Sequence, residues 1–200
     1  MEMVSMDKKN VLYILTDEWA DFEFAHVGAS VHFFRDYYRN VLAGIKKEPV
    51  VSIGGLTVIP DVDIHEAKEL PFDTLVLIGG NTWRQTDSPE LDNFVKKAAA
   101  ERKTVAGICN AAAYLGTIGI LNDVSHTAND LEELKEWAGD RYTNEAGFLK
   151  KQVVSDKNII TANGTAYLEF AREVMLTLRE IPEEGVRQWY ALYKNGFYPE

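Results

Sequence analysis

Short apolar runs rich in Val, Ile and Leu alternate along the chain with longer stretches of helical period. Three of these runs are Val11–Thr16 (VLYILT), Thr74–Gly80 (TLVLIGG) and Thr104–Ile108 (TVAGI). Short, continuously apolar runs are typical of strands that are buried on both faces, and helices of sufficient length can connect such strands in parallel. We therefore predict an α/β protein: a three-layer α/β/α sandwich with a mostly parallel central sheet.

The segments between these runs predict helices and one hairpin. An amphipathic helix is expected from about Phe22 into the aromatic cluster Phe33–Tyr38. A later helix is expected to begin at Pro89 with Ser88 as its N-cap, because both residue types are favoured at those positions. The paired glycines within Pro49–Asp61 separate two β-rich runs, which predicts a hairpin at the edge of the sheet.

The second half of the chain continues the alternation. We expect a helix over Asn129–Gly139, two strands within Phe148–Gly164 around a turn at Ser155–Asn158, and a helix over 165–180 that closes the core. Residues 181–200 are predicted to be a helical extension whose aromatic side chains pack on the body or on another subunit. Since no linker or repeat interrupts the pattern, residues 1–200 are predicted to form a single domain, with 1–9 flexible.

Composition and charge limit the classes of function. The formal net charge of -10 disfavours nucleic acids and anionic membrane surfaces, and no apolar run has the roughly 18 residues of a membrane span. The N-terminus lacks the apolar stretch of a signal peptide, so a cytoplasmic location is expected. One cysteine and four scattered histidines form no disulfide or metal pattern, and we expect no metal and no cofactor. A small-molecule substrate fits these limits.

Cys109 follows a predicted buried strand and precedes an alanine-rich helix. Gly107 and Ala111 lie two residues before and after it, which is the spacing of small residues in a nucleophile elbow. A lone cysteine is often only a small buried hydrophobe. At the start of a helix, however, unpaired amides and the helix dipole favour the thiolate. The spacing therefore predicts a reactive Cys109.

Five stretches, in this order along the chain, carry a family resemblance: WADFEFA, SIGGLTVIPD, LIGGN, AGICNAAAYLG and ITANGTAYLEFA. Together they resemble the ThiJ/PfpI family, which includes a parkinsonism-associated deglycase and PfpI-type intracellular proteases. The resemblance covers nearly the whole chain. It implies a flavodoxin-like, class I glutamine amidotransferase-like fold and a homodimer.

The resemblance also implies partners for the thiol. It places Glu23 beside Cys109, and in a parallel sheet the loops after two strands do share one edge. A carboxyl group next to a thiolate should shift toward its protonated form and donate a hydrogen bond to sulfur. The amides of Gly79, Gly80 and Asn81, together with that of Asn110, are candidates for an oxyanion site, although a plain Gly-Asn turn is the alternative.

Two histidines are candidates for a base near the thiol. Some family members have a histidine in the loop that corresponds to His126, whereas His26 lies three residues after Glu23 on the same helix face. The protease-like members carry a histidine directly after the cysteine, but this chain has Asn110 there. A peptidase dyad of adjacent residues is therefore in doubt.

Three functions follow from these residues. The first is a cysteine-dependent enzyme of the glyoxalase, deglycase or amidase type, in which Cys109 adds to a small electrophilic carbonyl or amide and Glu23 shuttles the proton. The second is a non-enzymatic redox sensor that uses oxidation of the same cysteine. The third, a glutamine amidotransferase-like domain, lacks the late histidine that its triad needs.

Overall fold

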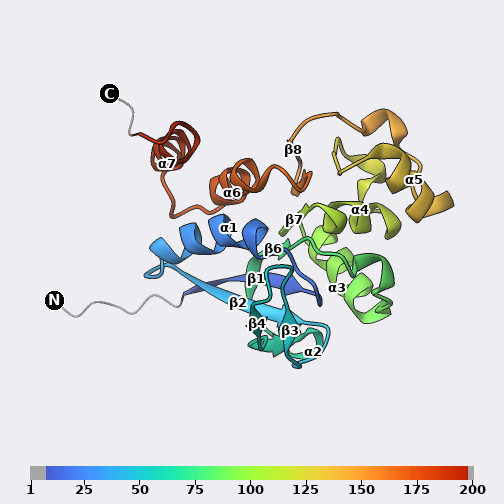
Figure 1. Ribbon diagram of the computed structural model, residues 1–200, viewed down its shortest axis with the longest axis horizontal. Coiled ribbons are helices and arrows are strands. Elements are labelled where there is room, and N and C mark those ends of the chain that lie inside the picture. The colour runs from blue at the N-terminus through green and yellow to red at the C-terminus, as the bar shows by residue number, and fades with distance from the viewer. Residues whose placement is uncertain (1–7, 198–200) are drawn as a thin grey trace.

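The computed structural model describes residues 8–197. Residues 1–7 of the segment 1–9 that was predicted to be flexible, and residues 198–200, lie outside the described part. Elements are labelled in chain order, η marking short 3-10 helices (Figure 1). They are β1 (Lys9–Leu15), α1 (Asp21–Phe33), β2 (Tyr38–Gly44), β3 (Val50–Val51), β4 (Thr57–Val58), β5 (Val62–Asp63), α2 (Ile64–Ala67), β6 (Phe72–Leu77), η1 (Trp83–Gln85), α3 (Pro89–Ala100), β7 (Thr104–Ile108), α4 (Asn110–Thr117), η2 (Ile120–Asp123), α5 (Leu131–Ala138), η3 (Gly139–Arg141), η4 (Glu145–Gly147), β8 (Val153–Asp156), β9 (Ile159–Ala162), α6 (Tyr167–Leu176) and α7 (Glu183–Asn195).

The predicted sandwich with a mostly parallel sheet is confirmed. Within the described residues the main sheet has the strand order β5-β2-β1-β6-β7-β9-β8, and only β8 runs antiparallel, to β9. Figure 1 shows α1 and α6 together on one face, with α7 beyond them, and α3, α4 and α5 on the other face. The chain therefore winds helices onto both faces of the sheet, as uniformly apolar strands require.

Alternate side chains along a strand pack into two separate hydrophobic cores, one on each face of the sheet. In β1, Leu12 and Ile14 pack with the α3 and α4 side, while Val11, Tyr13 and Leu15 pack with the α1 and α6 side. All five are at most 1% exposed. Because side chains alternate across a strand, a run of consecutive apolar residues is needed to fill both cores. This is the physical basis of the apolar runs in the sequence.

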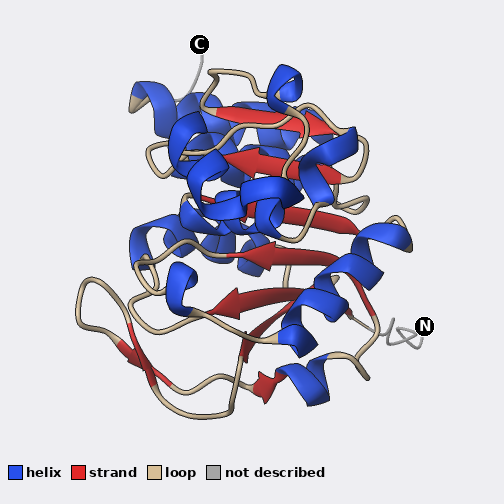
Figure 2. Cartoon of the chain, turned by 90° about the vertical axis from the view of Figure 1, so that its right-hand side faces the viewer, coloured by secondary structure: helices blue, strands red, loops and turns tan. Residues whose placement is uncertain are grey.

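The hairpin is present, but its predicted place at the edge of the main sheet is wrong. β3 and β4 pair with each other as a separate two-stranded ribbon, and β5 forms the edge of the main sheet instead. Figure 2 shows this ribbon projecting beyond the main sheet. The Asp21 carboxylate anchors it, accepting hydrogen bonds from the Ser52 hydroxyl at 2.6 Å and the Gly54 amide at 2.9 Å.

The first helix also differs from its prediction. α1 ends at Phe33, and Tyr38 already begins β2, a strand that the sequence analysis did not predict. Nor is the helix amphipathic: Phe22 and Phe33 are exposed, whereas Glu23 is fully buried. A buried acid on a buried helix face needs a reason other than packing.

The remaining elements lie close to their predicted ranges. Ser88 caps α3 by accepting a hydrogen bond from the Leu91 amide, and Pro89 is the first helical residue. The predicted pair of strands within 148–164 is the antiparallel pair β8 and β9, and α7 lies in the predicted C-terminal extension. Residue Lys9, predicted flexible, is the first residue of β1. Among residues 8–197 no helix combines the length and the apolar character needed to cross a membrane.

Candidate active site

Three strands and one helix bring the candidate residues together. Leu77 of β6 is in register with Gly107 of β7, and Ile108 of β7 is in register with Ala162 of β9. The residues that follow these strands therefore emerge at the same carboxyl edge of the sheet. Segments far apart in the sequence, around residues 79, 109 and 164, become neighbours there.

Cys109 lies on a strained turn between β7 and α4. Its backbone angles are φ 60° and ψ -130°, a conformation that L residues rarely adopt. A hydrogen bond of 2.9 Å from its amide to the Ala162 carbonyl holds the turn against β9. A Cβ at Gly107 would lie 3.1 Å from the Ala111 carbonyl oxygen, so the small residues let the turn close tightly. The thiol is only partly buried, and the predicted elbow is confirmed in its geometry.

Glu23 lies beside this thiol, at the start of α1. It is 0% exposed, and its Oε2 accepts a hydrogen bond of 2.9 Å from the Gly79 amide. Its Oε1 is buried without a hydrogen-bond partner among the described residues. A Cβ at Gly79 would come within 2.2 Å of Oε2 and 2.5 Å of the Cys109 Cβ. Glycine at position 79 is therefore what allows the carboxyl and the cysteine to approach each other.

The two acids shift each other's pKa. Burial raises the pKa of Glu23 to about 7, while the neighbouring Cys109 side chain and the hydrogen bond from the Gly79 amide act in the opposite direction. Burial also raises the pKa of Cys109, and the Glu23 charge adds to the rise, so that it reaches about 11. The upward shift predicted for Glu23 agrees with this direction, whereas the thiolate predicted for Cys109 does not. At neutral pH the negative charge of the pair lies on Glu23, and the ionised form of this carboxyl group faces the thiol and can accept its proton.

Asn129 is a site residue that the sequence analysis missed. Its Nδ2 donates to the Cys109 sulfur at 3.3 Å, and its Oδ1 accepts a hydrogen bond of 2.8 Å from the Gly164 amide. The Asn129 hydrogen bond and that of the Asn110 amide both lower the pKa of Cys109. A Cβ at Gly164 would lie 3.1 Å from the sulfur, so a larger residue there would crowd the thiol. Residues 128–130 carry no recognisable motif, so only the place of Asn129 in the fold reveals its contact with the thiol.

The four predicted oxyanion amides have different uses. The Gly79 amide donates to Glu23, and the Asn81 amide donates to the Glu18 carbonyl at 3.1 Å. Neither is available to a substrate. The Asn110 side chain donates to the Gly80 carbonyl at 2.8 Å and fixes the two segments to each other. The Gly80 amide has no acceptor among residues 8–197, and the Asn110 amide interacts with the Cys109 sulfur. Gly80 and Asn110 are therefore the two predicted donors that no residue other than Cys109 engages.

His126 lies in a different environment from the one predicted. It is fully buried, with Nδ1 at 2.9 Å from the Val124 carbonyl oxygen and Nε2 at 2.7 Å from the Tyr142 hydroxyl. Burial lowers its pKa. Because both ring nitrogens already have partners, these contacts fit a structural histidine that fixes the loop leading to Asn129.

His26 faces an aromatic cluster instead of the thiol. Its ring stacks on Tyr167, with centroids 5.3 Å apart, and meets Trp189 and Tyr193 edge to face. Burial lowers its pKa. The described contacts therefore leave Glu23 as the group placed to exchange a proton with Cys109.

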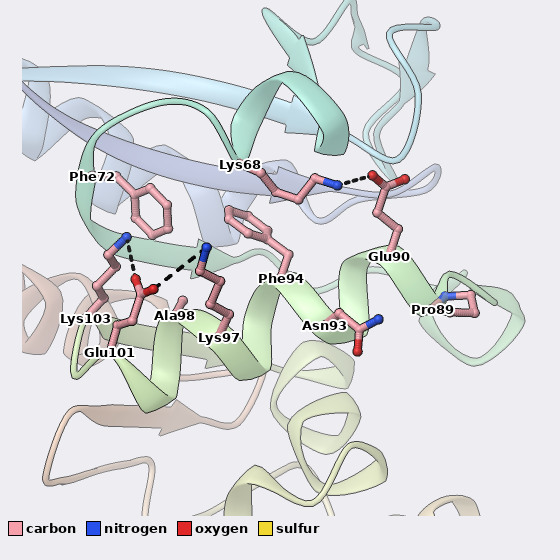
Figure 3. A pocket seen from close by; sticks show the side chains of 10 residues that line it. All are labelled: Lys68, Phe72, Pro89, Glu90, Asn93, Phe94, Lys97, Ala98, Glu101 and Lys103. Atoms are coloured by element: carbon pink, nitrogen blue, oxygen red, sulfur yellow. Dashed lines mark hydrogen bonds and ion pairs between the residues drawn. The ribbon is translucent and has the colours of Figure 1, made fainter.

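The surroundings of the site offer space for a small molecule. Asn129, which contacts the thiol, also lines a cavity of about 490 Å³, although Cys109 itself does not. Another cavity of about 410 Å³ lies between Phe72, Phe94 and paired lysines and glutamates (Figure 3). It opens near the start of β6 and β7, the opposite edge from Cys109, so it is not part of this site. Within residues 8–197 no three His, Cys, Asp or Glu side chains lie together in a way that could hold a metal ion.

Comparisons with known proteins agree with this fold. The model of the DJ-1/PfpI family matches residues 9–177. The chain is 32% identical to the "Uncharacterized protease YoaZ" of Bacillus subtilis, over 95% of this chain and 93% of that one. It is 25% identical to the "Glutathione-independent glyoxalase DJR-1.2" of Caenorhabditis elegans, over 71% and 74%. The crystal structure of the DJ-1 superfamily protein Atu0886 from Agrobacterium tumefaciens matches with a TM-score of 0.85 and 32% identity, over 94% and 98%. This chain belongs to the DJ-1/PfpI family.

Proposed function

We propose that the protein is a cysteine-dependent enzyme that converts small 2-oxoaldehydes to 2-hydroxy acids, a glyoxalase-type reaction. The observation that carries this proposal is the pairing of a partly buried thiol on a strained elbow with a fully buried carboxyl group whose pKa is about 7. A general base is most effective when its pKa is close to the working pH. Glu23 meets that condition because of its burial.

The first step is addition of sulfur to the aldehyde carbon. The Glu23 carboxylate accepts the thiol proton as the S–C bond forms, and the C=O π electrons move to oxygen. The amides of Gly80 and Asn110 donate to this developing oxyanion. Glu23 then returns the proton to that oxygen, which gives a hemithioacetal on Cys109.

The second step is an internal redox shift. The Glu23 carboxylate removes the hydrogen of the former aldehyde carbon as a proton, the electron pair left behind forms a C=C bond with the neighbouring carbonyl carbon, and the electrons of that carbonyl move to its oxygen to give an enediolate. Glu23 returns the proton to the neighbouring carbon, and the hydroxyl proton of the former aldehyde carbon moves to the neighbouring oxygen, which leaves a thioester of a 2-hydroxy acid. Water hydrolyses the thioester and restores the thiol. One carbon is oxidised and its neighbour is reduced, so the sum, with methylglyoxal, is addition of water to give lactate and needs no further reagent.

Proteolysis has less support from this site. Cleavage of an amide needs a group that protonates the amine as it leaves, and the residue after the cysteine, Asn110, is bound to the Gly80 carbonyl. His126 is engaged by Val124 and Tyr142. The relative DJR-1.2 is named as a glutathione-independent glyoxalase, which supports the choice of a 2-oxoaldehyde.

The test is turnover of methylglyoxal by the wild type, Cys109→Ala and Glu23→Gln, with lactate measured by mass spectrometry. We expect turnover in the wild type alone, with a rate that rises as the pH passes through about 7, because the base is the ionised form of Glu23. His126→Asn is a control that should keep its inflection near pH 7. Oxidation of Cys109 by peroxide without any turnover would instead support the redox-sensor function.

A further inference from the structure

The loop between β1 and α1, residues 16–20, lies between the β3–β4 ribbon and the loop that carries Gly79 and Gly80. Trp19 makes an isolated β-bridge on each side, parallel to Ser52, which directly follows β3, and antiparallel to Gly80. The contact with Gly80 is close, because a Cβ there would lie 2.9 Å from the Cα of Trp19. The loop before α1 therefore connects the ribbon to residues that surround the thiol.

The ribbon holds the first residue of α1, Asp21. Its carboxylate accepts hydrogen bonds from the Ser52 hydroxyl at 2.6 Å and from the Gly54 amide at 2.9 Å. Ser52 is only 5% exposed, and a Cβ at Gly54 would lie 2.1 Å from Asp21 Oδ2, so this contact is closely packed. The Ile53 amide adds a hydrogen bond of 2.9 Å to the Trp19 carbonyl. The ribbon therefore fixes the place where α1 begins.

On its other side, the same loop is bound to the residues that follow β6. The Ala20 amide donates to the Gly79 carbonyl at 2.9 Å, and the Gly79 amide donates to the Glu23 carboxyl group at 2.9 Å. Glu23 lies two residues after Asp21, in the first turn of α1. A displacement of the start of α1 would therefore move Glu23 away from both Gly79 and Cys109.

We propose that Asp21 and Ser52 are positioning residues for the reaction at Cys109: through their hydrogen bond, the ribbon holds the first turn of α1 so that the Glu23 carboxyl group stays beside the thiol and shielded from water. Both residues act through Glu23. Their role rests on the proposed function, because that reaction uses Glu23 as its base. Catalysis is sensitive to such placement, since a shift of about 1 Å can lower a rate about a hundredfold.

The pKa of Glu23 reports whether this placement is kept. Burial is the main cause of its rise to about 7. If the first turn of α1 loosens, water reaches the carboxyl group, and its pKa should fall toward the ordinary value of 4.5. A carboxylate with a lower pKa is a weaker base for a thiol. Loss of the contact between Asp21 and Ser52 should therefore change both the rate and the pH at which the rate rises.

The test combines methylglyoxal kinetics with a titration of Glu23 by nuclear magnetic resonance of labelled glutamate carboxyl carbons, in which Glu23→Gln identifies the signal. In Asp21→Ala we expect kcat to fall about tenfold with little change in KM, and both the inflection of the rate and the pKa of Glu23 to fall below about 6. Asp21→Asn keeps an oxygen for both donors and should recover most of the rate and a pKa near that of the wild type. Ser52→Ala removes one donor and should shift both quantities in the same direction by less.

Asp61→Ala is the matched control. The Asp61 carboxylate accepts a hydrogen bond of 2.9 Å from the Leu42 amide, so it anchors the other end of the ribbon to β2 instead of α1. This variant should keep the wild-type pKa of Glu23 and the wild-type inflection of the rate.

Thermal unfolding shows which variants keep the fold, and Ser52→Ala decides the question if Asp21→Ala does not. The proposal is overturned if Glu23 keeps its pKa in the folded Asp21→Ala and Ser52→Ala proteins, or if Asp61→Ala lowers it equally. A wild type that does not turn over methylglyoxal would contradict the proposed function instead. The titration would still show whether Asp21 and Ser52 hold Glu23 in place.

Discussion

Glu23 is a residue whose position weakens the folded state. Its carboxyl group is fully buried, one oxygen has a single backbone donor, and the other has no partner among the described residues. Burial raises its pKa from 4.5 to about 7. The unfolded chain therefore ionises Glu23 more readily than the folded protein does. The folded protein retains this cost because the same burial makes Glu23 a base for Cys109.

Glu23→Gln should therefore stabilise the protein in a pH-dependent way. A glutamine keeps an oxygen to accept from the Gly79 amide and cannot ionise. In the wild type, the loss of stability that comes from burying an ionisable Glu23 is absent below pH 4.5, grows as the pH rises, and is complete above about pH 7. At about 1.4 kcal/mol per pKa unit, the variant should be more stable by about 3 kcal/mol at pH 8 and equal near pH 4. Urea unfolding at the two pH values checks this, and a gain of the same size at both would show that ionisation is not its cause.

Asn129→Ala should lower the reactivity of Cys109. The substitution removes the amide that donates to sulfur at 3.3 Å and the oxygen that accepts from Gly164. Since that donor lowers the thiol pKa, its loss should slow alkylation by iodoacetamide about fivefold at pH 8. Asn129→Asp is the matched comparison: it keeps the acceptor for Gly164 and replaces the donor. If Asn129→Asp is alkylated at the wild-type rate, the slower alkylation of Asn129→Ala comes from a change in the loop and not from the lost hydrogen bond to sulfur.

Residues at the thiol differed in how far the sequence predicted them. Cys109 could be singled out because the elbow spacing is recognisable, and the family resemblance placed Glu23 beside it, which the shared edge of parallel strands allows. Asn129 could not, since an asparagine in a polar loop has the same local signature whether or not it reaches a distant thiol. His126 shows the opposite error. It was a candidate for a base near the thiol, but its Nε2 lies 2.7 Å from the Tyr142 hydroxyl.

Among the elements, β2 shows why some strands cannot be predicted from local sequence. β1, β6 and β7 were predicted because each contains a short, continuous apolar run, but the sequence YRNVLAG of β2 includes Arg39 and Asn40. Asn40 is tolerated because its side chain donates to the Gly28 carbonyl at 2.8 Å and accepts from the Tyr13 hydroxyl at 3.2 Å. Both partners belong to other elements, so the local sequence does not reveal them.

The C-terminal helix α7 is held to α6 by a carboxylate that is almost buried. The Glu169 side chain is 8% exposed and accepts from Lys194 at 2.7 Å and from Tyr190 at 2.9 Å. Burial acts to raise its pKa, but these hydrogen bonds outweigh it and lower the pKa. The guanidinium of Arg172 lies over the Tyr190 ring, 4.5 Å from its centre.

Lys194→Ala should therefore loosen α7. The variant leaves Glu169 buried with one hydrogen-bond donor fewer, which we expect to lower the free energy of unfolding. Arg187→Ala is the control on the same helix: its pair with Glu183 is about two-thirds exposed, so its loss should lower the free energy of unfolding less than the loss of Lys194 does. Limited proteolysis should cut α7 faster in Lys194→Ala only. Equal rates in both variants would contradict a special role for Glu169.

At the scale of the whole molecule, the β3–β4 ribbon and its flanks carry a cluster of exposed apolar side chains. Val51, Ile53, Leu56 and Ile59 are 42 to 66% exposed within ten residues of sequence. The ribbon projects beyond the sheet and is anchored to α1 through Asp21 (Figure 2). The sequence analysis expected the aromatic C-terminal region to pack on the body or on another subunit, and Tyr190 of α7 does pack on the body, where it donates to Glu169 of α6. The exposed apolar side chains of the ribbon make it a candidate for contact between two copies of the chain.

We predict that the protein is a homodimer through this ribbon and that Leu56→Asp separates it into monomers, because a charge in an apolar contact is not compensated. Leu176→Asp is the matched control, since Leu176 is 41% exposed on α6, away from the ribbon. Each copy carries a formal charge of -10, so salt that screens the repulsion should strengthen the dimer of the wild type. Sedimentation equilibrium at low and high salt measures both effects. A wild type that stays monomeric, or a Leu176→Asp protein that dissociates as readily as Leu56→Asp, would rule out the ribbon as the interface.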